Sequence, residues 1–140
     1  MAVAEAVGLR RLDQAYAAMA EAGNDRERWI GPDLRFHQAI IRATGNELMG
    51  PLGAIIETAL ATSFRLSSAH PEGPRHSLPL HGAILAAIRR RKPTAAAAAM
   101  RRLLAGAAED VRQALAVSRA GTPPRTRTAR RTPLTQHSHV

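Results

Sequence analysis

Apolar residues recur at spacings of three and four through most of this 140-residue chain, and that period belongs to amphipathic helices. The first such segment runs from about residue 4 to residue 21 and places four side chains on one face: Leu9, Leu12, Tyr16 and Met19. The segments are rich in Ala, Leu and Ile, whereas aromatic residues make up only 3% of the chain. This composition favours packed helices over sheets, so we predict an all-α protein.

Glycine and proline divide the chain into about five helices. Gly23 and Gly45 end the first two, and Asp25 is a suitable N-cap for the second, which must either begin near Pro32 or bend there. The later helices are predicted over residues 47 into the sixties, 75–91 and 94–119, with a loop over residues 67–74. We expect these helices to form an antiparallel bundle.

Residues 1–120 are long enough to form one helical domain, whereas residues 121–140 differ in composition. The last 20 residues are mostly Thr, Pro, Arg and Ser, which bury too little surface to offset the entropy of ordering, so we predict a disordered basic tail. The formal net charge is +9. Residues 1–120 hold 16 basic and 11 acidic residues, a net +5, and four arginines in the tail supply +4. Because nearly half of the excess lies in the tail, the charge is a weak indication of nucleic-acid binding.

Cysteine is absent, which excludes a disulfide framework, a thiolate metal site and a cysteine nucleophile. No segment reaches the roughly 18 uninterrupted apolar residues of a membrane span, and the N-terminus lacks the pattern of a signal peptide. We therefore expect a cytoplasmic protein that makes no use of a membrane.

The second helix places a carboxylate and an imidazole, Asp33 and His37, inside its apolar stripe. The rest of the stripe is Trp29, Phe36, Ile40, Ile41 and Thr44, and the opposite side carries Arg35, Gln38 and Arg42. An ionised carboxylate in an apolar interior is costly unless it is paired, so Asp33 requires a donor side chain or a metal ion as its partner.

Two interpretations of these residues remain open. Asp33 and His37 are four residues apart on a helix, and His81 lies in the apolar arc of the fourth helix, so the three offer oxygen and nitrogen donors suited to zinc, manganese, nickel or iron. Alternatively, Asp33 and His37 form a hydrogen-bonded pair and His81 is a satisfied core histidine. Ser63 and Ser77 also lie on inward faces and either bind an effector or bond to their own helix backbone.

Four segments in order carry a family resemblance: residues 33–37 (DLRFH), 43–46 (ATGN), 80–88 (LHGAILAAI) and 98–104 (AAMRRLL). Together they resemble the FCD effector-binding domain of GntR-family (FadR-subfamily) bacterial transcription regulators, over roughly residues 9–117. The resemblance implies a helical bundle that binds a small organic acid, often through a metal held by an aspartate and histidines.

In that pattern Asp33, His37 and His81 match three ligand positions, and Leu103 lies where a fourth ligand, usually histidine, is expected. The resemblance therefore implies one of two sites. One is a metal site with three protein ligands and more room for water or effector, and the other is a pocket that binds its effector without metal. Leu103 and residues 77–81 (SLPLH) are similar to members that sense sugar acids such as galactonate.

Full-length members carry a winged helix-turn-helix ahead of this domain, and the residues before Leu9 are too few to form one. We expect an N-terminally truncated regulator or a stand-alone effector module that forms a homodimer and reaches DNA only through an absent or partner domain. A metal-dependent enzyme is disfavoured because no general base adjoins the ligands and no phosphate loop or nucleophile elbow occurs. A stand-alone dimerisation module is the remaining alternative.

Overall fold

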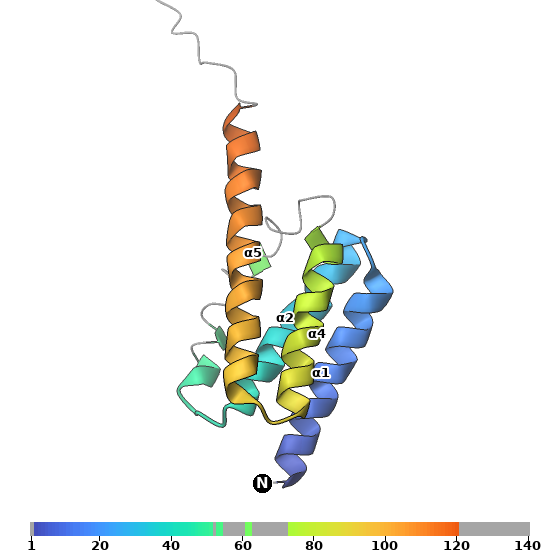
Figure 1. The fold of residues 1–140 in the computed structure, drawn as a ribbon, viewed down its shortest axis with the longest axis vertical. Coiled ribbons are helices and arrows are strands. Elements are labelled where there is room, and N and C mark those ends of the chain that lie inside the picture. The colour runs from blue at the N-terminus through green and yellow to red at the C-terminus, as the bar shows by residue number, and fades with distance from the viewer. Residues whose placement is uncertain (1, 52, 55–60, 63–72, 121–140) are drawn as a thin grey trace, which may run out of the picture.

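The structure is a computed structural model that describes residues 2–51, 53–54, 61–62 and 73–120. All of these residues belong to helices, turns or short connections, and no strand occurs among them, which confirms the predicted all-α class (Figure 1). Within these ranges, no helix is long and apolar enough to span a membrane.

Helices α1 (Ala2–Ala22) and α2 (Arg26–Ala43) form an antiparallel hairpin. Gly23 closes α1 with a φ of 54°, and the Asp25 side chain caps α2 by accepting a hydrogen bond from the Arg28 backbone N–H at 3.2 Å. Helix α2 begins six residues before Pro32, which lies buried inside it, so the alternative of a start near the proline is wrong.

Helix α2 ends where the sequence predicts, because Gly45 adopts a φ of 65° that an L-residue rarely takes. Thr44 caps this end through its hydroxyl, which donates to the Ile41 carbonyl at 2.7 Å; it is exposed and does not belong to the packed stripe. The Asn46 side chain accepts from the Leu48 N–H at 3.0 Å, and the described residues that follow, 49–51, 53–54 and 61–62, are helical.

Helices α4 (Gly73–Arg89) and α5 (Pro93–Ala120) form a second hairpin. Gly73 and Pro74, predicted to belong to a loop, are buried in the first turn of α4, and the remainder of that predicted loop lies outside the described residues. Arg91 closes α4 with a φ of 52°, and Pro93 opens α5, where its missing N–H costs nothing.

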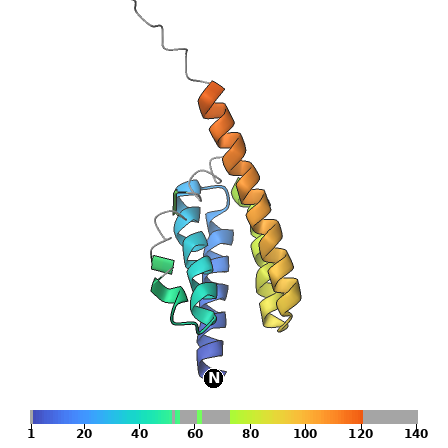
Figure 2. The ribbon, with the colours of Figure 1, turned by 90° about the vertical axis from the view of Figure 1, so that its left-hand side faces the viewer.

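The two hairpins pack as neighbouring pairs, with α4 against both α5 and α1 (Figure 2). Gly82 permits the contact between α4 and α1, since a Cβ there would lie 2.9 Å from the Tyr16 hydroxyl. Helices α1, α2, α4 and α5 each contribute to the core, which contains Leu12, Ala15, Met19, Ala22, Trp29, Phe36, Ala39, Ile84, Leu85, Ala99 and Leu103.

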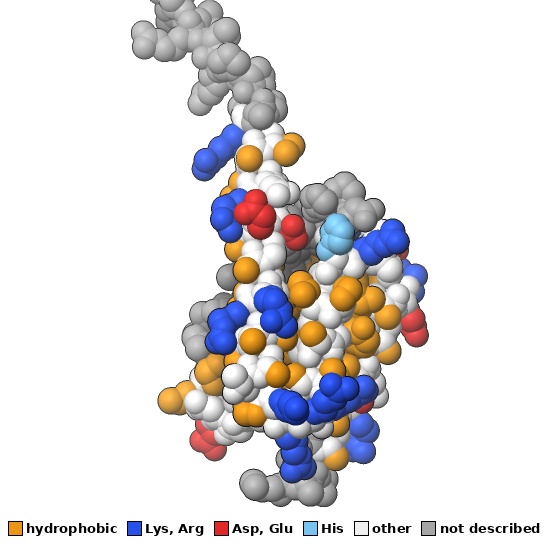
Figure 3. Space-filling view, viewed as in Figure 1, with side chains coloured by type: hydrophobic (Ala, Val, Ile, Leu, Met, Phe, Trp, Pro, Cys, Tyr) orange, Lys and Arg blue, Asp and Glu red, His pale blue; other side chains and the backbone are white. Residues whose placement is uncertain are grey.

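Helix α5 extends well past the other labelled helices, and its distal part stands clear of the body (Figures 1 and 3). Leu103 in its proximal part is only 5% exposed, but Leu104 is 53% and Leu115 is 44% exposed. The spacing of apolar residues in the segment 94–119 predicts that Leu104 and Leu115 face inward with Leu103, and their exposure shows that this prediction is wrong. The predicted tail, residues 121–140, lies outside the described residues.

Candidate metal centre

Helices α2 and α4 bring together the three side chains that the sequence singles out: Asp33, His37 and His81. One donor atom from each lies within 4.8 Å of the other two. Asp33 Oδ1 lies 2.9 Å from His81 Nε2 and 3.5 Å from His37 Nε2. Residues 33 and 37 are one helical turn apart on the inner face of α2, and α4 supplies His81 from the other hairpin.

Aromatic rings enclose the two imidazoles. Phe36 meets the His81 ring edge to face at a centroid distance of 5.1 Å, and Trp29 does so at 6.1 Å. The rings of His37 and His81 are themselves 5.4 Å apart and nearly perpendicular. These contacts leave the His81 side chain 1% exposed and restrict the orientation of its ring.

Ser77 fixes the other nitrogen of His81. The Nδ1 atom lies 2.9 Å from the Ser77 backbone carbonyl and 3.2 Å from the Ser77 hydroxyl. A carbonyl can only accept, so Nδ1 carries a proton and donates it to Ser77. In the neutral ring Nε2 is therefore unprotonated, and it lies 2.9 Å from the Asp33 carboxylate as a second acceptor atom.

Asp33 is ionised at neutral pH in spite of its burial. Removal from water raises the pKa of this carboxyl, but the neighbouring imidazoles of His37 and His81 outweigh that effect and bring the pKa below its ordinary value. The site therefore presents a negative charge surrounded by apolar and imidazole side chains.

These donors fit a metal ion, because two of them face each other without a hydrogen bond. Asp33 Oδ1 and His81 Nε2 are both inaccessible to solvent, and neither has a hydrogen-bond partner within the described part of the chain. Two acceptor atoms 2.9 Å apart repel each other unless they share a proton or a cation. The contact lacks hydrogen-bond geometry, which favours a cation, and a carboxylate with two imidazoles is a common donor set for zinc and related metals.

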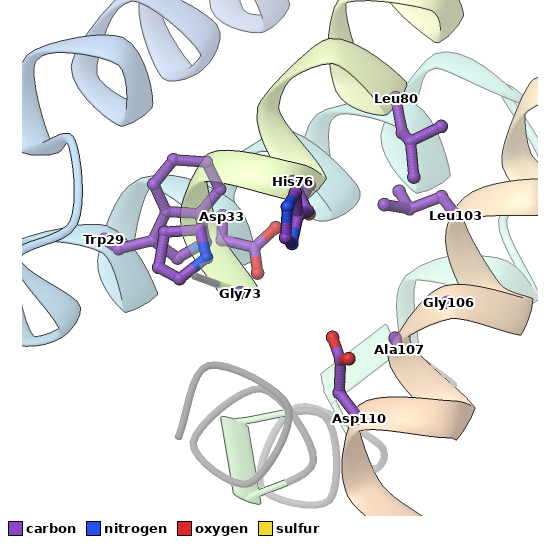
Figure 4. A pocket seen from close by; sticks show the side chains of 11 residues that line it. Trp29, Asp33, Gly73, His76, Leu80, Leu103, Gly106, Ala107 and Asp110 are labelled. Carbon is purple, nitrogen blue, oxygen red and sulfur yellow. The ribbon is translucent and has the colours of Figure 1, made fainter. Parts of the chain in front are cut away.

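A cleft with a volume of about 110 Å³ opens beside Asp33 (Figure 4). Its apolar wall includes Trp29, Leu80 and Leu103, and the last two lie next to each other where α4 faces α5. Leu103, the residue at the expected fourth ligand position, thus lines the cleft as an apolar group. Ser77 lines it as well, whereas Ser63, the other predicted effector-binding residue, lies outside the described residues.

The family model of the FCD domain matches residues 2–106, about three quarters of the chain. The chain belongs to the FCD domain family. The match confirms the resemblance, and its range of 2–106 begins and ends earlier than the predicted range of about 9–117. FCD domains are ligand-sensing regulatory parts of GntR-type transcription regulators, which are not enzymes. No curated protein and no solved structure shows significant similarity to the chain.

Two polar residues that line the cleft of this FCD domain were not predicted from the sequence: His76 on α4 and Asp110 on α5. Asp110 follows Leu103 by seven residues and Ala107 by three, so it shares a helix face with the buried Leu103. That spacing is the signal that would have identified it. His76 is largely exposed and precedes His81 by five residues, which gives no comparable signal.

Proposed function

We propose that this FCD domain senses a small carboxylate-bearing metabolite through a divalent metal ion held by Asp33, His37 and His81. The observation that carries the proposal is the pair of buried acceptor atoms, Asp33 Oδ1 and His81 Nε2, that face each other without a hydrogen bond. Zinc, manganese and nickel all accept this donor set.

The metal would supply a positive charge that attracts the carboxylate of an effector. Leu103 offers no ligand atom, so three protein ligands would leave coordination positions for water or effector. The lone pair on His81 Nε2 is maintained by the Ser77 carbonyl, which holds the Nδ1 proton.

The cleft supports an effector that carries hydroxyl groups as well as a carboxylate. Ser77, His76 and Asp110 offer hydrogen-bonding groups, whereas Trp29 and Leu80 cover apolar carbon atoms. The Asp110 carboxylate would repel a second acid group but accept hydrogen bonds from hydroxyls. A sugar acid resembling galactonate meets both conditions, with Ser77 and the predicted Ser63 as hydrogen-bond donors.

The domain would act as the sensing half of a bacterial transcription regulator in the cytoplasm. We propose that residues 1–120 form this domain, that it works as a homodimer, and that residues 121–140 are a separate basic tail. Because the cleft lies between α2, α4 and α5, an effector would favour one packing of the two hairpins. A DNA-binding partner domain would respond to that shift in population.

The metal is tested first, by elemental analysis of purified wild-type protein and of Asp33→Ala and His76→Ala variants. We expect stoichiometric divalent metal in the wild type and in His76→Ala, whose histidine is not among the three donors, and none in Asp33→Ala. Equal metal content in Asp33→Ala and wild type would overturn this site.

The effector is then tested by thermal unfolding with galactonate, in the presence and absence of the metal. A sensor gains stability from the ligand by mass action and leaves it chemically unchanged. Turnover of the sugar acid would instead indicate an enzyme, and stabilisation that persists in the metal-free protein would contradict the proposed role of the metal.

A further inference from the structure

A second concave surface lies between α1 and α2, on the face of α2 that points away from Asp33. It has a volume of about 300 Å³, and we call it the arginine groove. At about 100° per residue, Arg35 and Arg42 project from the side of α2 opposite Asp33, so the groove is separate from the metal centre. The groove is lined by Arg11, Gln14, Ala15, Arg35, Gln38, Ala39 and Arg42.

Two alanines make this surface hollow. Ala15 on α1 and Ala39 on α2 are 3% and 2% exposed, and they form the floor of the groove where the helices touch. A methyl group fills little space, so the long arginine and glutamine side chains on both sides rise above the floor as walls. The groove thus results from small residues at the helix contact and long polar residues beside it.

The register of the hairpin spreads the three arginines along the groove. A Cβ on Gly8 would lie 3.7 Å from the Ala43 Cβ, so residue 8 of α1 is level with residue 43 of α2. Because the helices are antiparallel, Arg11 is then level with residues near 40, between Arg35 and Arg42. Arg35 and Arg42 lie seven residues apart, or about 10 Å along the axis of α2.

Among the residues that the structure describes, no acid compensates the positive charge in the arginine groove. None of its lining residues is acidic, and within the described ranges no carboxylate pairs with Arg11, Arg35 or Arg42. Asp13, an acid of α1, is engaged elsewhere: it accepts a 2.6 Å hydrogen bond from Arg89 of α4. Guanidinium groups bind phosphate and carboxylate oxygens in pairs, and the amides of Gln14 and Gln38 suit hydroxyl groups between them.

We propose that the arginine groove is a binding site for a small metabolite with two phosphate groups, one near Arg35 and the other between Arg11 and Arg42. The volume falls at the lower end of the range for small-molecule sites. A duplex nucleic acid is a poorer fit, since the basic groups line a floored hollow between two helices and do not extend along a protruding surface. The site is independent of the metal and of the effector proposed above.

Calorimetric titration with fructose 1,6-bisphosphate tests the proposal on the full chain at about 0.15 M salt, with fructose 6-phosphate as the single-phosphate comparison. The decisive variant is Arg35→Gln/Arg42→Gln. The matched control is Arg101→Gln/Arg102→Gln, which removes the same charge from exposed positions on α5. Circular dichroism and thermal unfolding establish that both variants are folded.

We expect the wild type to bind the bisphosphate saturably. The affinity should be at least about tenfold lower for the single-phosphate sugar, and the affinity of Arg35→Gln/Arg42→Gln for the bisphosphate should fall by a similar factor. Each charge-assisted contact contributes about that much to the affinity. The control variant should bind as the wild type does, and so should protein stripped of metal and dialysed. This last result separates the groove from the metal centre.

Three results would overturn the proposal. The first is the absence of saturable binding, and the second is an equal loss of affinity in the control variant, which would reflect net charge alone. The third is retention of duplex DNA through Arg35 and Arg42 that the bisphosphate does not displace.

Discussion

The two faces of α2 carry charge in opposite ways. The inner face places Asp33 in the core, 6% exposed, where His37 and His81 surround it. The outer face places Arg35 and Arg42 at the surface, where water solvates them and, among the described residues, no carboxylate pairs with them. A charge in the core affects folding because desolvation must be compensated, whereas a charge at the surface costs little and is free to serve a ligand.

The largest effect that would test this contrast is expected from His81→Ala. The substitution removes a fully buried ring that packs against Trp29 and Phe36 and leaves a cavity, so the free energy of unfolding should fall by about 3 kcal/mol or more. Urea unfolding in the presence of a chelator measures the effect without the metal. His76→Ala on the same helix is the control, and we expect a change within about 0.5 kcal/mol because His76 is exposed. Equal losses in both variants would contradict the contrast.

Metal removal should have the next largest effect. A metal present at 100 times its dissociation constant stabilises the folded state by about 2.7 kcal/mol, and that contribution disappears on chelation. Thermal unfolding before and after chelation should show the difference in wild type but not in Asp33→Ala. A similar response of both proteins would place any bound metal away from the inner face.

Lowering the pH should reduce the free energy of unfolding by a smaller amount. The folded-state pKa of Asp33 is below its ordinary value of 3.8, so the stabilisation by the ionised carboxylate is complete above that value. It is lost as the pH falls through the lower folded value. The advantage of wild type over Asp33→Asn, measured by urea unfolding between about pH 5 and pH 2 with chelator, should therefore shrink in acid. An advantage that grows in acid would contradict the direction of the pKa shift.

The smallest effect is expected on the outer face. Arg35→Gln and Arg42→Gln should each change the free energy of unfolding by no more than about 0.5 kcal/mol, since both side chains are exposed and unpaired with carboxylates among the described residues. Urea unfolding of each single variant tests this. A loss comparable with that of His81→Ala would show that the outer arginines hold the hairpin together.

Local signals made the helix boundaries predictable from the sequence. Asp25 caps α2 through its own side chain, and Gly23 and Gly45 end helices because their positive φ suits glycine. Such features depend on a few neighbouring residues. The burial of Leu115 was mispredicted because helical periodicity assumes a packing partner along the whole helix, and α5 continues past the other labelled helices. Leu104 is exposed because it points about 100° away from the buried Leu103.

The candidate metal centre was predictable only in part. Spacing placed Asp33 and His37 together, but their proximity to His81 depends on how α4 packs against α2, and for that the sequence offered only the resemblance to FCD domains. The arginine groove could not be predicted from the sequence, because it too depends on how two helices pack. Periodicity placed Arg35 and Arg42 on one side of α2, whereas the position of Arg11 follows from the register of the α1–α2 hairpin.

Because α5 is long, a small movement at the cleft would become a larger movement at the far end of the helix. Leu103 touches the cleft, and the helix continues for 17 residues to Ala120, about 25 Å farther along its axis. A tilt of about 2° with its pivot at Pro93, about 15 Å before Leu103 along the helix, would move Leu103 by about 0.5 Å and the far end by about 1.4 Å. A ligand that moves Leu103 away from Leu80 by that fraction of an ångström would therefore move the far end of α5 nearly three times as far.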